Sequence, residues 1–460
     1  MSRILFILGP SLFALLQILP FGLTSVQQSM AAIMAWVIVW WLHPTIPLAI
    51  TGLIGVCLSV LLGAVKFQAA LAGFANPIIF LFMGGFFFAE ALRYQATDLW
   101  IAERCLSMKI IKGSALRVLI CLTILTAIFS SILSNSATTA MMMPLALSLF
   151  THLKIRDDHP SFKLLLLIAY AASIGGIGTP LGTPPNVLGI SLLNSMAGIQ
   201  ITFMDWVFRM FPLMLGILIA VFAIFWKELK MLPKGIGVYA RPAALTISQR
   251  RVLYLLGATI CLWFLPGMTQ LILGSDHQLS KFLIERMPEG LVAILMSSFL
   301  FIIPGKNNET LLPWRESHKI DWGTLLLFGS GISLGQTVFD SGLAAVLGNA
   351  MPFQQLPYAL ALLLMLLVTL ILTEFMSNTA SANLLVPLVI VTPPFSQAPM
   401  IPVICVTLVC SLGFMLPVGT PPNAIAYGTG KIKIRWMFDK GFKLNIICLL
   451  IIWVMGLLQQ

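Results

Sequence analysis

The sequence predicts an all-α protein that crosses a membrane many times and contains two inverted copies of one unit. Three observations support this. Hydrophobic residues make up 59% of the 460 residues and charged residues only 9%, whereas a soluble domain carries about 25% charged residues. Apolar runs long enough to cross a bilayer follow one another along the chain, and a lipid-exposed run must satisfy its own backbone hydrogen bonds, which favours helices. Finally, several motifs of the first half recur in the second.

The net charge of +11 does not indicate nucleic acid as a partner, because the basic residues lie in short loops between apolar runs. It reports topology instead. With a cytoplasmic amino terminus, 23 of the 27 lysines and arginines fall on the inner side, as the positive-inside rule requires. We therefore expect an integral membrane protein, in the inner (plasma) membrane of a bacterium, with its carboxyl terminus on the outer side.

Nine of the apolar runs are continuous and are predicted to be single spanning helices. They occupy about residues 4–20, 28–43, 45–64, 74–93, 203–226, 249–272, 285–303, 322–339 and 435–457.

Four further stretches are interrupted. Polar triplets divide 115–152 and 356–395, which we interpret as re-entrant hairpins, and Gly-Thr-Pro-Pro-Asn divides 163–200 and 398–430, which we interpret as discontinuous helices. The prediction is therefore about eleven transmembrane helices plus two re-entrant hairpins.

Both interruptions occur twice. Ser134-Asn135-Ser136-Ala137 recurs as Ser377-Asn378-Thr379-Ala380 at an offset of 243, and Gly182-Thr183-Pro184-Pro185-Asn186 recurs as Gly419-Thr420-Pro421-Pro422-Asn423 at an offset of 237. Residues 81–85 echo 327–331 at an offset of 246. Because the counted topology places the two hairpins on opposite sides, the halves are predicted to be inverted, the arrangement of secondary transporters.

A polar triplet inside an apolar hairpin is costly unless it is satisfied. At a hairpin tip the second arm starts with free N–H groups and the first arm ends in free carbonyls. One tip can therefore offer donors to an anion and acceptors to a cation. The alternative is that Ser and Thr only let helices pack closely, but two matched tips favour a ligand site.

The two Gly-Thr-Pro-Pro-Asn motifs predict the start of a helix inside the bilayer. Thr183 and Thr420 are suited to the N-cap, and the prolines that follow each of them suit the first turn. Gly182 and Gly419 allow the preceding backbone to unwind. Ordinary proline kinks are the alternative, but irregular backbone at bilayer depth survives only where it is buried in protein or lines a polar cavity.

The chain resembles the divalent anion/sodium symporter family, whose members carry di- and tricarboxylates and sulfate. The resemblance lies in these motifs, in the length, in the stretch Pro77 to Ala91 and in the segment 46–51 (Ile-Pro-Leu-Ala-Ile-Thr). The resemblance covers essentially the whole chain. It implies a homodimer in membrane lipid that works as an elevator. Residues 1–112 and 231–351 would form the scaffold, each ending in an arm near the membrane plane, and 113–230 and 352–460 the transport part.

The resemblance also implies the ligands. Each sodium site combines one tip with one break: the first matches Ser130, Ser134, Asn135 and Gly182, and the second matches Thr373, Met376, Asn378 and Gly419. Substrate carboxylates would meet both tips and the threonines of both breaks, which are Ser134, Asn135, Ser136, Ser377, Asn378, Thr379, Thr183 and Thr420. Ser136 departs from the family pattern, which usually has Thr, and this puts substrate size or affinity in doubt.

Charge around these motifs indicates how transport is driven. The windows 128–140, 178–190, 370–382 and 415–428 contain no Lys, Arg or His, so a dianion there needs a bound cation. Hard oxygen ligands suit Na+, and two sites follow from the repeat. Glu374, just before the second tip, is either a buried structural acceptor or a proton or cation group.

The function predicted is import of a C4 dicarboxylate such as succinate, malate or fumarate, coupled to at least two Na+, with no organic cofactor. A carboxylate/carboxylate exchanger of the same fold, or a tricarboxylate, tartrate or sulfate carrier, is the alternative. A membrane enzyme is disfavoured because no catalytic constellation lies in the apolar segments. A channel is disfavoured because discontinuous helices in inverted repeats favour alternating access.

Overall fold

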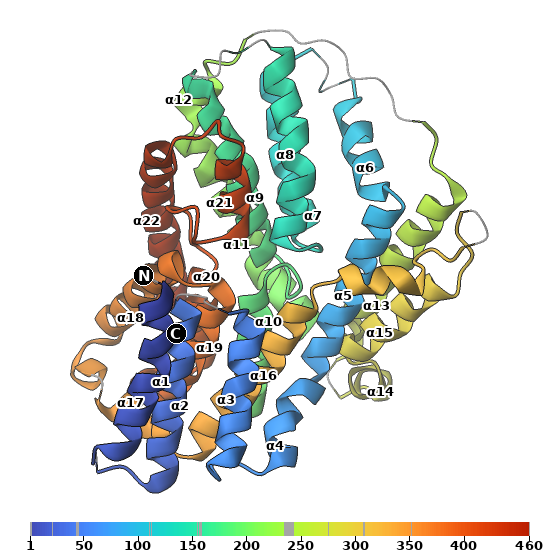
Figure 1. Ribbon diagram of the computed structural model, residues 1–460. Coiled ribbons are helices and arrows are strands. Elements are labelled where there is room, and N and C mark those ends of the chain that lie inside the picture. Colours follow the sequence, from blue (N-terminus) through green and yellow to red (C-terminus); the bar gives the residue numbers. More distant parts are fainter. Residues whose placement is uncertain are drawn as a thin grey trace.

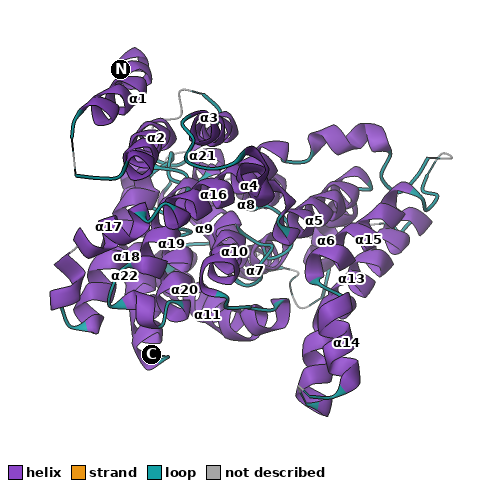
Figure 2. Ribbon diagram, turned by 90° about the horizontal axis from the view of Figure 1, so that it is seen from below, coloured by secondary structure: helices purple, strands orange, loops and turns teal. Residues whose placement is uncertain are grey.

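The computed structural model describes residues 2–20, 22–42, 46–109, 111, 113–153, 155, 159–233, 243–274, 276–306, 309–350 and 352–459. Within them lie 22 α-helices and six short 3-10 helices, and no strand beyond one isolated bridge between Pro304 and Thr310. Figure 1 and Figure 2 show this helical body, with α1 and α14 at opposite edges in Figure 2. The all-α prediction is confirmed.

The first part of the chain supplies helices that pack beside a later one. Gly52 and Gly55 of α3 leave room for Ser330 and Leu334 of α16, so that these two helices pack closely. Asn76 caps α5 by accepting from the Ile78 N–H, and Pro77 occupies its first turn. The helices here are α1 (Ser2–Ile18), α2 (Ser25–Leu42), α3 (Leu48–Leu61), α4 (Phe67–Ala72), η1 (Gly73–Ala75), α5 (Pro77–Tyr94) and α6 (Thr97–Leu106).

The first pair of interrupted stretches, 115–152 and 163–200, is interrupted where its polar and proline motifs predict. A helix hairpin turns at residues 131–134, and the next helix stops before Gly-Thr-Pro-Pro-Asn and restarts at its first proline. The helices are α7 (Ala115–Ser130), α8 (Asn135–His152), η2 (Pro160–Leu165), α9 (Leu166–Ile177), α10 (Pro184–Ala197), α11 (Phe203–Ile224) and α12 (Trp226–Leu229).

A second group of helices includes the long α13, which a Thr246/Gln249 capping box begins. Its members are α13 (Ile247–Leu273), α14 (Gln278–Arg286), α15 (Glu289–Ser298), η3 (Phe299–Phe301), η4 (Trp314–Lys319), α16 (Trp322–Asp340), α17 (Leu343–Ala350) and η5 (Pro352–Gln355).

The second interrupted pair repeats the pattern of the first with a tighter tip of two residues, Met376 and Ser377. Its helices are α18 (Tyr358–Phe375), α19 (Asn378–Val391), η6 (Phe395–Gln397), α20 (Met400–Val409), α21 (Pro421–Gly428) and α22 (Ile434–Leu458).

The two interrupted pairs are interlocked. The second arm of each hairpin packs against the helix that follows the break of the other half: α8 against α21, and α19 against α10. In Figure 1, α7, α8 and α21 lie in the upper part of the molecule, and α10, α18 and α19 lie in the lower part. The two halves of the chain therefore pack together through these helix pairs.

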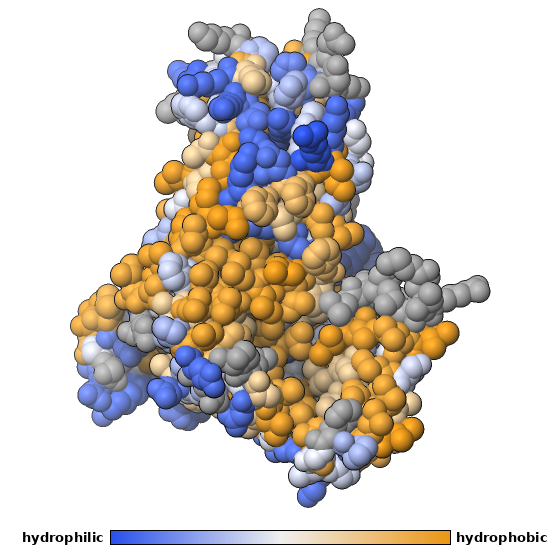
Figure 3. All heavy atoms as spheres, turned by 90° about the vertical axis from the view of Figure 1, so that its left-hand side faces the viewer, coloured by the Kyte–Doolittle hydropathy of each residue, from blue (hydrophilic) through white to orange (hydrophobic). Residues whose placement is uncertain are grey.

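The surface agrees with a lipid environment. Figure 3 shows a broad apolar face across the middle, with polar atoms at its upper end and along its lower edge. Large side chains such as Ile219, Leu271 and Leu458 are 69%, 78% and 82% exposed, which only lipid accommodates at little cost.

Six described helical segments are long and apolar enough to cross a membrane by themselves: Pro77–Tyr94, Pro160–Ile177, Phe203–Ile224, Ile247–Leu273, Tyr358–Phe375 and Ile434–Leu458. The other predicted spans correspond to shorter or less apolar helices, or to broken pairs. One of the six, Tyr358–Phe375, is the first arm of a predicted re-entrant hairpin, so length alone would also permit it to cross. Both expected arms contain a short helix, α6 and α17. Of the basic residues in the topology count, Lys112, Lys154, Arg156, Lys234 and Arg241 lie outside the described residues.

A buried ion cluster joins α12 to α22. Lys440 donates to Glu228 at 2.9 Å and to the Ile224 carbonyl at 2.8 Å, and Lys163 lies 3.5 Å from Glu228. Glu228 and Lys440 are 6% and 7% exposed. Because Glu228 serves two lysines, it is the member whose loss leaves most charge uncompensated.

We predict that Glu228→Gln lowers stability by about 3–5 kcal/mol, and that Lys440→Met costs less because Lys163 still faces Glu228. Thermal unfolding of the purified variants in detergent measures both. The control is Lys443→Met, which breaks an exposed pair with Asp439 and should change little. Equal effects of Glu228→Gln and the control would contradict this role.

Candidate functional site

The first hairpin tip brings its polar residues to the start of α8. Ser134 caps this helix by accepting from the Ala137 N–H at 3.3 Å. Ser130, fully buried at the end of α7, donates to the Asn135 side-chain oxygen at 2.6 Å. The two arms are therefore tied together directly across the tip.

The Asn135 amide also faces the break of the same half. With its nitrogen turned inward, Asn135 donates to Ser130 Oγ at 2.6 Å, to the Gly182 carbonyl at 3.0 Å and to the Ala172 carbonyl at 3.1 Å. With its oxygen turned inward, the Asn135 side-chain oxygen faces three further oxygens, those of the Ser130 hydroxyl and of the Gly182 and Ala172 carbonyls. Such a set of neutral oxygens repels itself when empty and suits a hard cation.

The second tip has the same arrangement. Thr373, fully buried at the end of α18, donates to the Asn378 side-chain oxygen at 3.1 Å and lies 2.5 Å from the Cys410 carbonyl. The hydroxyl and the amide are again five residues apart and bridge the arms. The structure thus brings together Ser130 with Asn135, and Thr373 with Asn378.

Each break contains an asparagine whose side-chain amide binds the backbone carbonyls of the interruption. Asn186 donates to the carbonyls of Gly176 and Thr179 at 2.9 and 2.8 Å. Asn423 donates to the carbonyls of Gly413 and Leu416 at 2.9 and 3.0 Å. The Thr179 and Leu416 carbonyls each accept a backbone N–H as well, from Gly182 at 3.3 Å and from Gly419 at 3.2 Å. An unpaired buried carbonyl is costly, so the two amides stabilise the breaks chiefly through the carbonyls of Gly176 and Gly413.

Sequence reasoning quoted both asparagines within the repeated motif but assigned neither of them a role. The signal was available, because Gly176 and Asn186 recur as Gly413 and Asn423 at the motif's own offset of 237, although Leu416 stands where the first half has Thr179. Gly176 and Gly182 permit close approach of the backbone. A Cβ on Gly176 would lie 2.7 Å from the Asn135 side-chain oxygen, and a Cβ on Gly182 would lie 2.4 Å from the Gly176 carbonyl.

Glu374 is a buried acceptor. Its carboxylate accepts from the Met415 N–H at 3.0 Å, from the Leu416 N–H at 3.2 Å and from the Asn445 amide at 2.6 Å. It therefore ties the second break and α22 to the end of α18, which agrees with the structural alternative. A Cβ on Gly419 would lie 3.3 Å from this carboxylate, so Glu374 also places a negative charge beside the second break.

The remaining predicted residues differ in what they contact. Thr420 accepts from the Asn423 N–H at 3.3 Å, as an N-cap should. Thr183 occupies the N-cap position without that bond, and its hydroxyl, in a residue 1% exposed, has no partner among the described residues. Pro184 and Pro421 open the helices as predicted, followed by Pro185 and Pro422.

The predicted substrate residues of the two tips differ in how deeply they are buried. Ser136 and Ser377 are half-buried, and Thr379 is 6% exposed. Met376 is buried in an apolar cluster with residues of α2, α3 and α16. None of these contacts joins Met376 to the Thr373–Asn378 pair, so its place in a sodium site stays a prediction.

The electrostatics of the site come from helix ends. The helices α8, α10, α19 and α21 all begin at the tips or breaks, and each N-terminus carries a partial charge of about +0.5. Among the described residues, no group of three His, Cys, Asp or Glu could hold a metal ion. A cation in this part of the molecule would therefore be held by hydroxyl, amide and carbonyl oxygens.

The chain matches the sequence model of the citrate transporter family, CitMHS, over residues 32–409. It is 36% identical to an uncharacterized transporter of Haemophilus influenzae, covering 99% of this chain and 96% of the relative. It is 31% identical to the sodium-dependent dicarboxylate transporter SdcS of Staphylococcus saprophyticus and 30% identical to that of Staphylococcus aureus strain USA300. Each of these two alignments covers 97% of this chain and 89% of the relative.

Among solved structures, the YdaH transporter of Alcanivorax borkumensis, whose topology is described as unusual, is similar with a TM-score of 0.56 at 14% identity, over 87% of both chains. At this identity the similarity concerns the fold alone. Together these findings bear out the family resemblance seen in the motifs. The chain belongs to the citrate transporter family, related to the sodium-dependent dicarboxylate transporters, and is an integral membrane transporter.

Proposed function

We propose that this protein imports a C4 dicarboxylate, such as succinate, malate or fumarate, in symport with sodium. The observation that carries the proposal is the pair of oxygen-rich tips, each with a hydroxyl and an amide across the turn and broken backbone beside it. The relatives named as sodium-dependent dicarboxylate transporters support the same substrate and the same coupling ion.

The cation step follows from the first tip. Ser130 Oγ and the carbonyl oxygens of Ala172 and Gly182 each lie 2.6–3.1 Å from the inward atom of the Asn135 amide. A Na+ drawn to these oxygens turns the amide oxygen inward. The Asn135 nitrogen then turns outward, where it can donate to a carboxylate. Binding of the cation and of the anion is thereby linked through one side chain.

The second tip offers the matching site through Thr373 and Asn378, with Gly419 and Met376 as its remaining proposed members. Here Glu374 adds a negative charge beside the break, which favours a cation and disfavours an anion that arrives alone. The dianion therefore needs the sodium ions first, since helix N-termini alone supply only partial charges.

The substrate groups proposed are Asn135, Ser136, Asn378 and Thr379, with Ser134, Ser377, Thr183 and Thr420 beside them. Thr183 supports this assignment because its buried hydroxyl is unpartnered at the start of α10. An unsatisfied buried donor costs about 1–3 kcal/mol, and a carboxylate would relieve it.

We propose that transport proceeds as an elevator between two inverted repeats. Residues 113–230 and 352–460 would move against a scaffold formed by 1–112 and 231–351. The contact between α16 and α19 supports a sliding surface, because Gly331 of α16 lies against Asn383. Asn383 is 3% exposed, and neither its side-chain oxygen nor its nitrogen has a hydrogen-bond partner among the described residues. No side-chain hydrogen bond of Asn383 therefore fixes α19 to α16.

The proposed orientation, with a cytoplasmic amino terminus and an outer carboxyl terminus in a bacterial inner membrane, rests on the distribution of lysine and arginine. The proposed homodimer rests on the family resemblance.

We predict that proteoliposomes take up labelled succinate when an inward sodium gradient is imposed, with a sigmoidal dependence on sodium because at least two Na+ bind. Potassium or choline should not replace sodium. Uptake driven equally well by internal dicarboxylate in sodium-free buffer would contradict symport and favour the exchanger.

We predict that Asn135→Ala and Asn378→Ala each lower succinate uptake by about tenfold or more, because each amide serves cation and anion together. Asp at either position should be as harmful, since a carboxylate repels the substrate. Thr151→Ala, at the far end of α8, is the matched control. Thermal unfolding checks that the variants remain folded, and full activity of both Ala variants would remove the site assignment.

We predict that Gly331→Ala lowers uptake about tenfold, because its Cβ would lie 1.9 Å from the Asn383 side-chain oxygen and overpacking costs about 1–3 kcal/mol. Adding Asn383→Ala should restore the space and the rate. Gly257→Ala, whose Cβ meets nothing within 4 Å, is the control. Normal uptake by the single Gly331→Ala variant would argue against sliding at this contact.

A further inference from the structure

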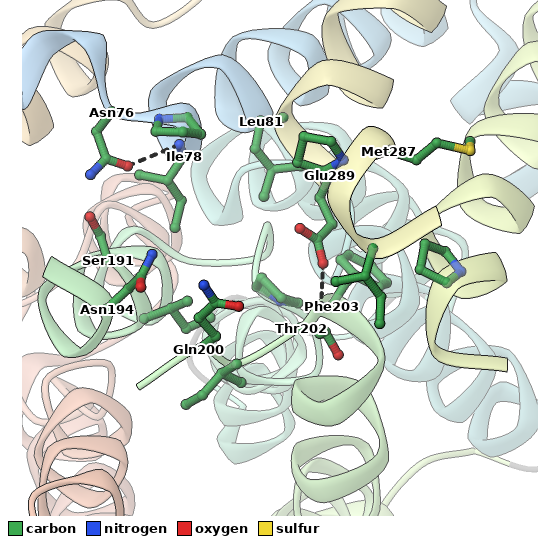
Figure 4. Close-up of a pocket in the computed structure, with 18 residues that line it drawn as sticks. Asn76, Ile78, Leu81, Ser191, Asn194, Gln200, Thr202, Phe203, Met287 and Glu289 are labelled. Atoms are coloured by element: carbon green, nitrogen blue, oxygen red, sulfur yellow. Dashed lines mark hydrogen bonds between the residues drawn. The ribbon is translucent and has the colours of Figure 1, made fainter. Parts of the chain in front are cut away.

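One cavity is lined by none of the tip residues. It has a volume of about 290 Å³ and is bounded by the start of α5, by α10, by residues 200–203, by Pro266 of α13 and by the junction of α14 and α15. Figure 4 shows polar side chains converging on it from different elements. Under the proposed division, α5, α13, α14 and α15 belong to the scaffold, and α10 and residues 200–203 to the transport part.

One wall of the cavity is polar and contains an unpartnered hydroxyl. Ser191 of α10 is 3% exposed, and its hydroxyl has no partner among the described residues. Asn194, one turn further along α10, and Asn76, before α5, lie on the same side of the cavity as Ser191 (Figure 4), and the Asn76 oxygen accepts from the Ile78 N–H. An unpartnered buried hydroxyl is costly, so a ligand with a polar end would be stabilised here.

The opposite wall carries one carboxylate. Glu289 accepts from the Phe203 N–H at 3.0 Å through one oxygen, and its carboxylate points into the cavity (Figure 4). Phe203 stacks on Trp263 with ring centroids 4.9 Å apart, which leaves an apolar floor between the two polar walls. An aromatic or aliphatic body fits this floor.

The charge of the cavity excludes the transported dianion. Glu289 is the one charged side chain among the described residues that line it, and no Lys, Arg or His joins it. A carboxylate ligand would therefore be repelled, whereas an ammonium group would gain a charge-assisted hydrogen bond. The size corresponds to a small ligand of about ten to twenty non-hydrogen atoms.

We propose that this cavity is a binding site for a small organic monocation, with its ammonium on Glu289, its apolar body over Phe203 and a hydroxyl directed at Ser191. Pro180, within the first break, also lines the cavity. A ligand here would span both parts of the proposed elevator and hold them in the present arrangement. The binding is independent of the proposed function, but the effect on transport rests on it.

The test uses three phenols that share one ring: tyramine, the uncharged 4-ethylphenol and the anionic 4-hydroxyphenylacetate. Titration calorimetry of the purified full chain in detergent should give saturable binding of tyramine, at least about tenfold weaker binding of 4-ethylphenol, and none of the anion. Glu289→Gln, which keeps an acceptor for the Phe203 N–H, should weaken tyramine binding about tenfold. Glu285→Gln, on exposed α14, is the matched control and should not.

Ser191→Leu, which fills the polar wall, provides a second variant and should abolish binding. Equal affinity for all three phenols, or tyramine binding unchanged by both Glu289→Gln and Ser191→Leu, would overturn the site. In proteoliposomes, tyramine should lower the maximal succinate uptake without changing the substrate concentration at half-maximal rate, and Glu289→Gln should relieve this. Tyramine binding to a protein that shows no sodium-driven uptake would support the site while contradicting the proposed function.

Discussion

Backbone groups that are left without helical partners inside an apolar body constrain this molecule more than any other interaction. Each break in a helix exposes several carbonyls and N–H groups that lipid cannot satisfy. The chain meets the requirement with side-chain amides. Asn186 and Asn423 bind two carbonyls each within the breaks, and Asn135 and Asn378 join the tips. The polar groups that transport would use are the same groups that must be satisfied for folding.

The two halves meet this constraint differently at one point. In the first half the break is joined to the hairpin tip by Thr179, whose hydroxyl donates to the Ser131 carbonyl. In the second half Glu374 stands at the position that matches Ser131 and binds the N–H groups of Met415 and Leu416. One half thus uses a neutral contact and the other a buried carboxylate. The two proposed sodium sites would therefore differ in charge, and their cation affinities would be unequal.

Charge also separates the two tips from the cavity beside Glu289. The tips present neutral oxygens and helix N-termini, which suit a cation and an anion bound together. The cavity between α5, α10 and α15 presents a single carboxylate, polar amides and the unpartnered hydroxyl of Ser191. The cavity thereby disfavours the dianion, so a small cation bound beside Glu289 would not compete directly with a dicarboxylate.

The sequence by itself determined the membrane class, the all-α fold and the positions of both helix hairpins and both breaks, because apolar run length and Gly-Thr-Pro-Pro-Asn act locally on the backbone. It also paired Ser130 with Thr373 through the repeat. Only the tertiary structure decided that α8 packs on α21 and α10 on α19, that Asn445 reaches Glu374, and that Ser191 and Glu289 face one cavity. These contacts join residues far apart in the chain, and apolar periodicity is the same whichever neighbour covers a helix face, so no local pattern could select them.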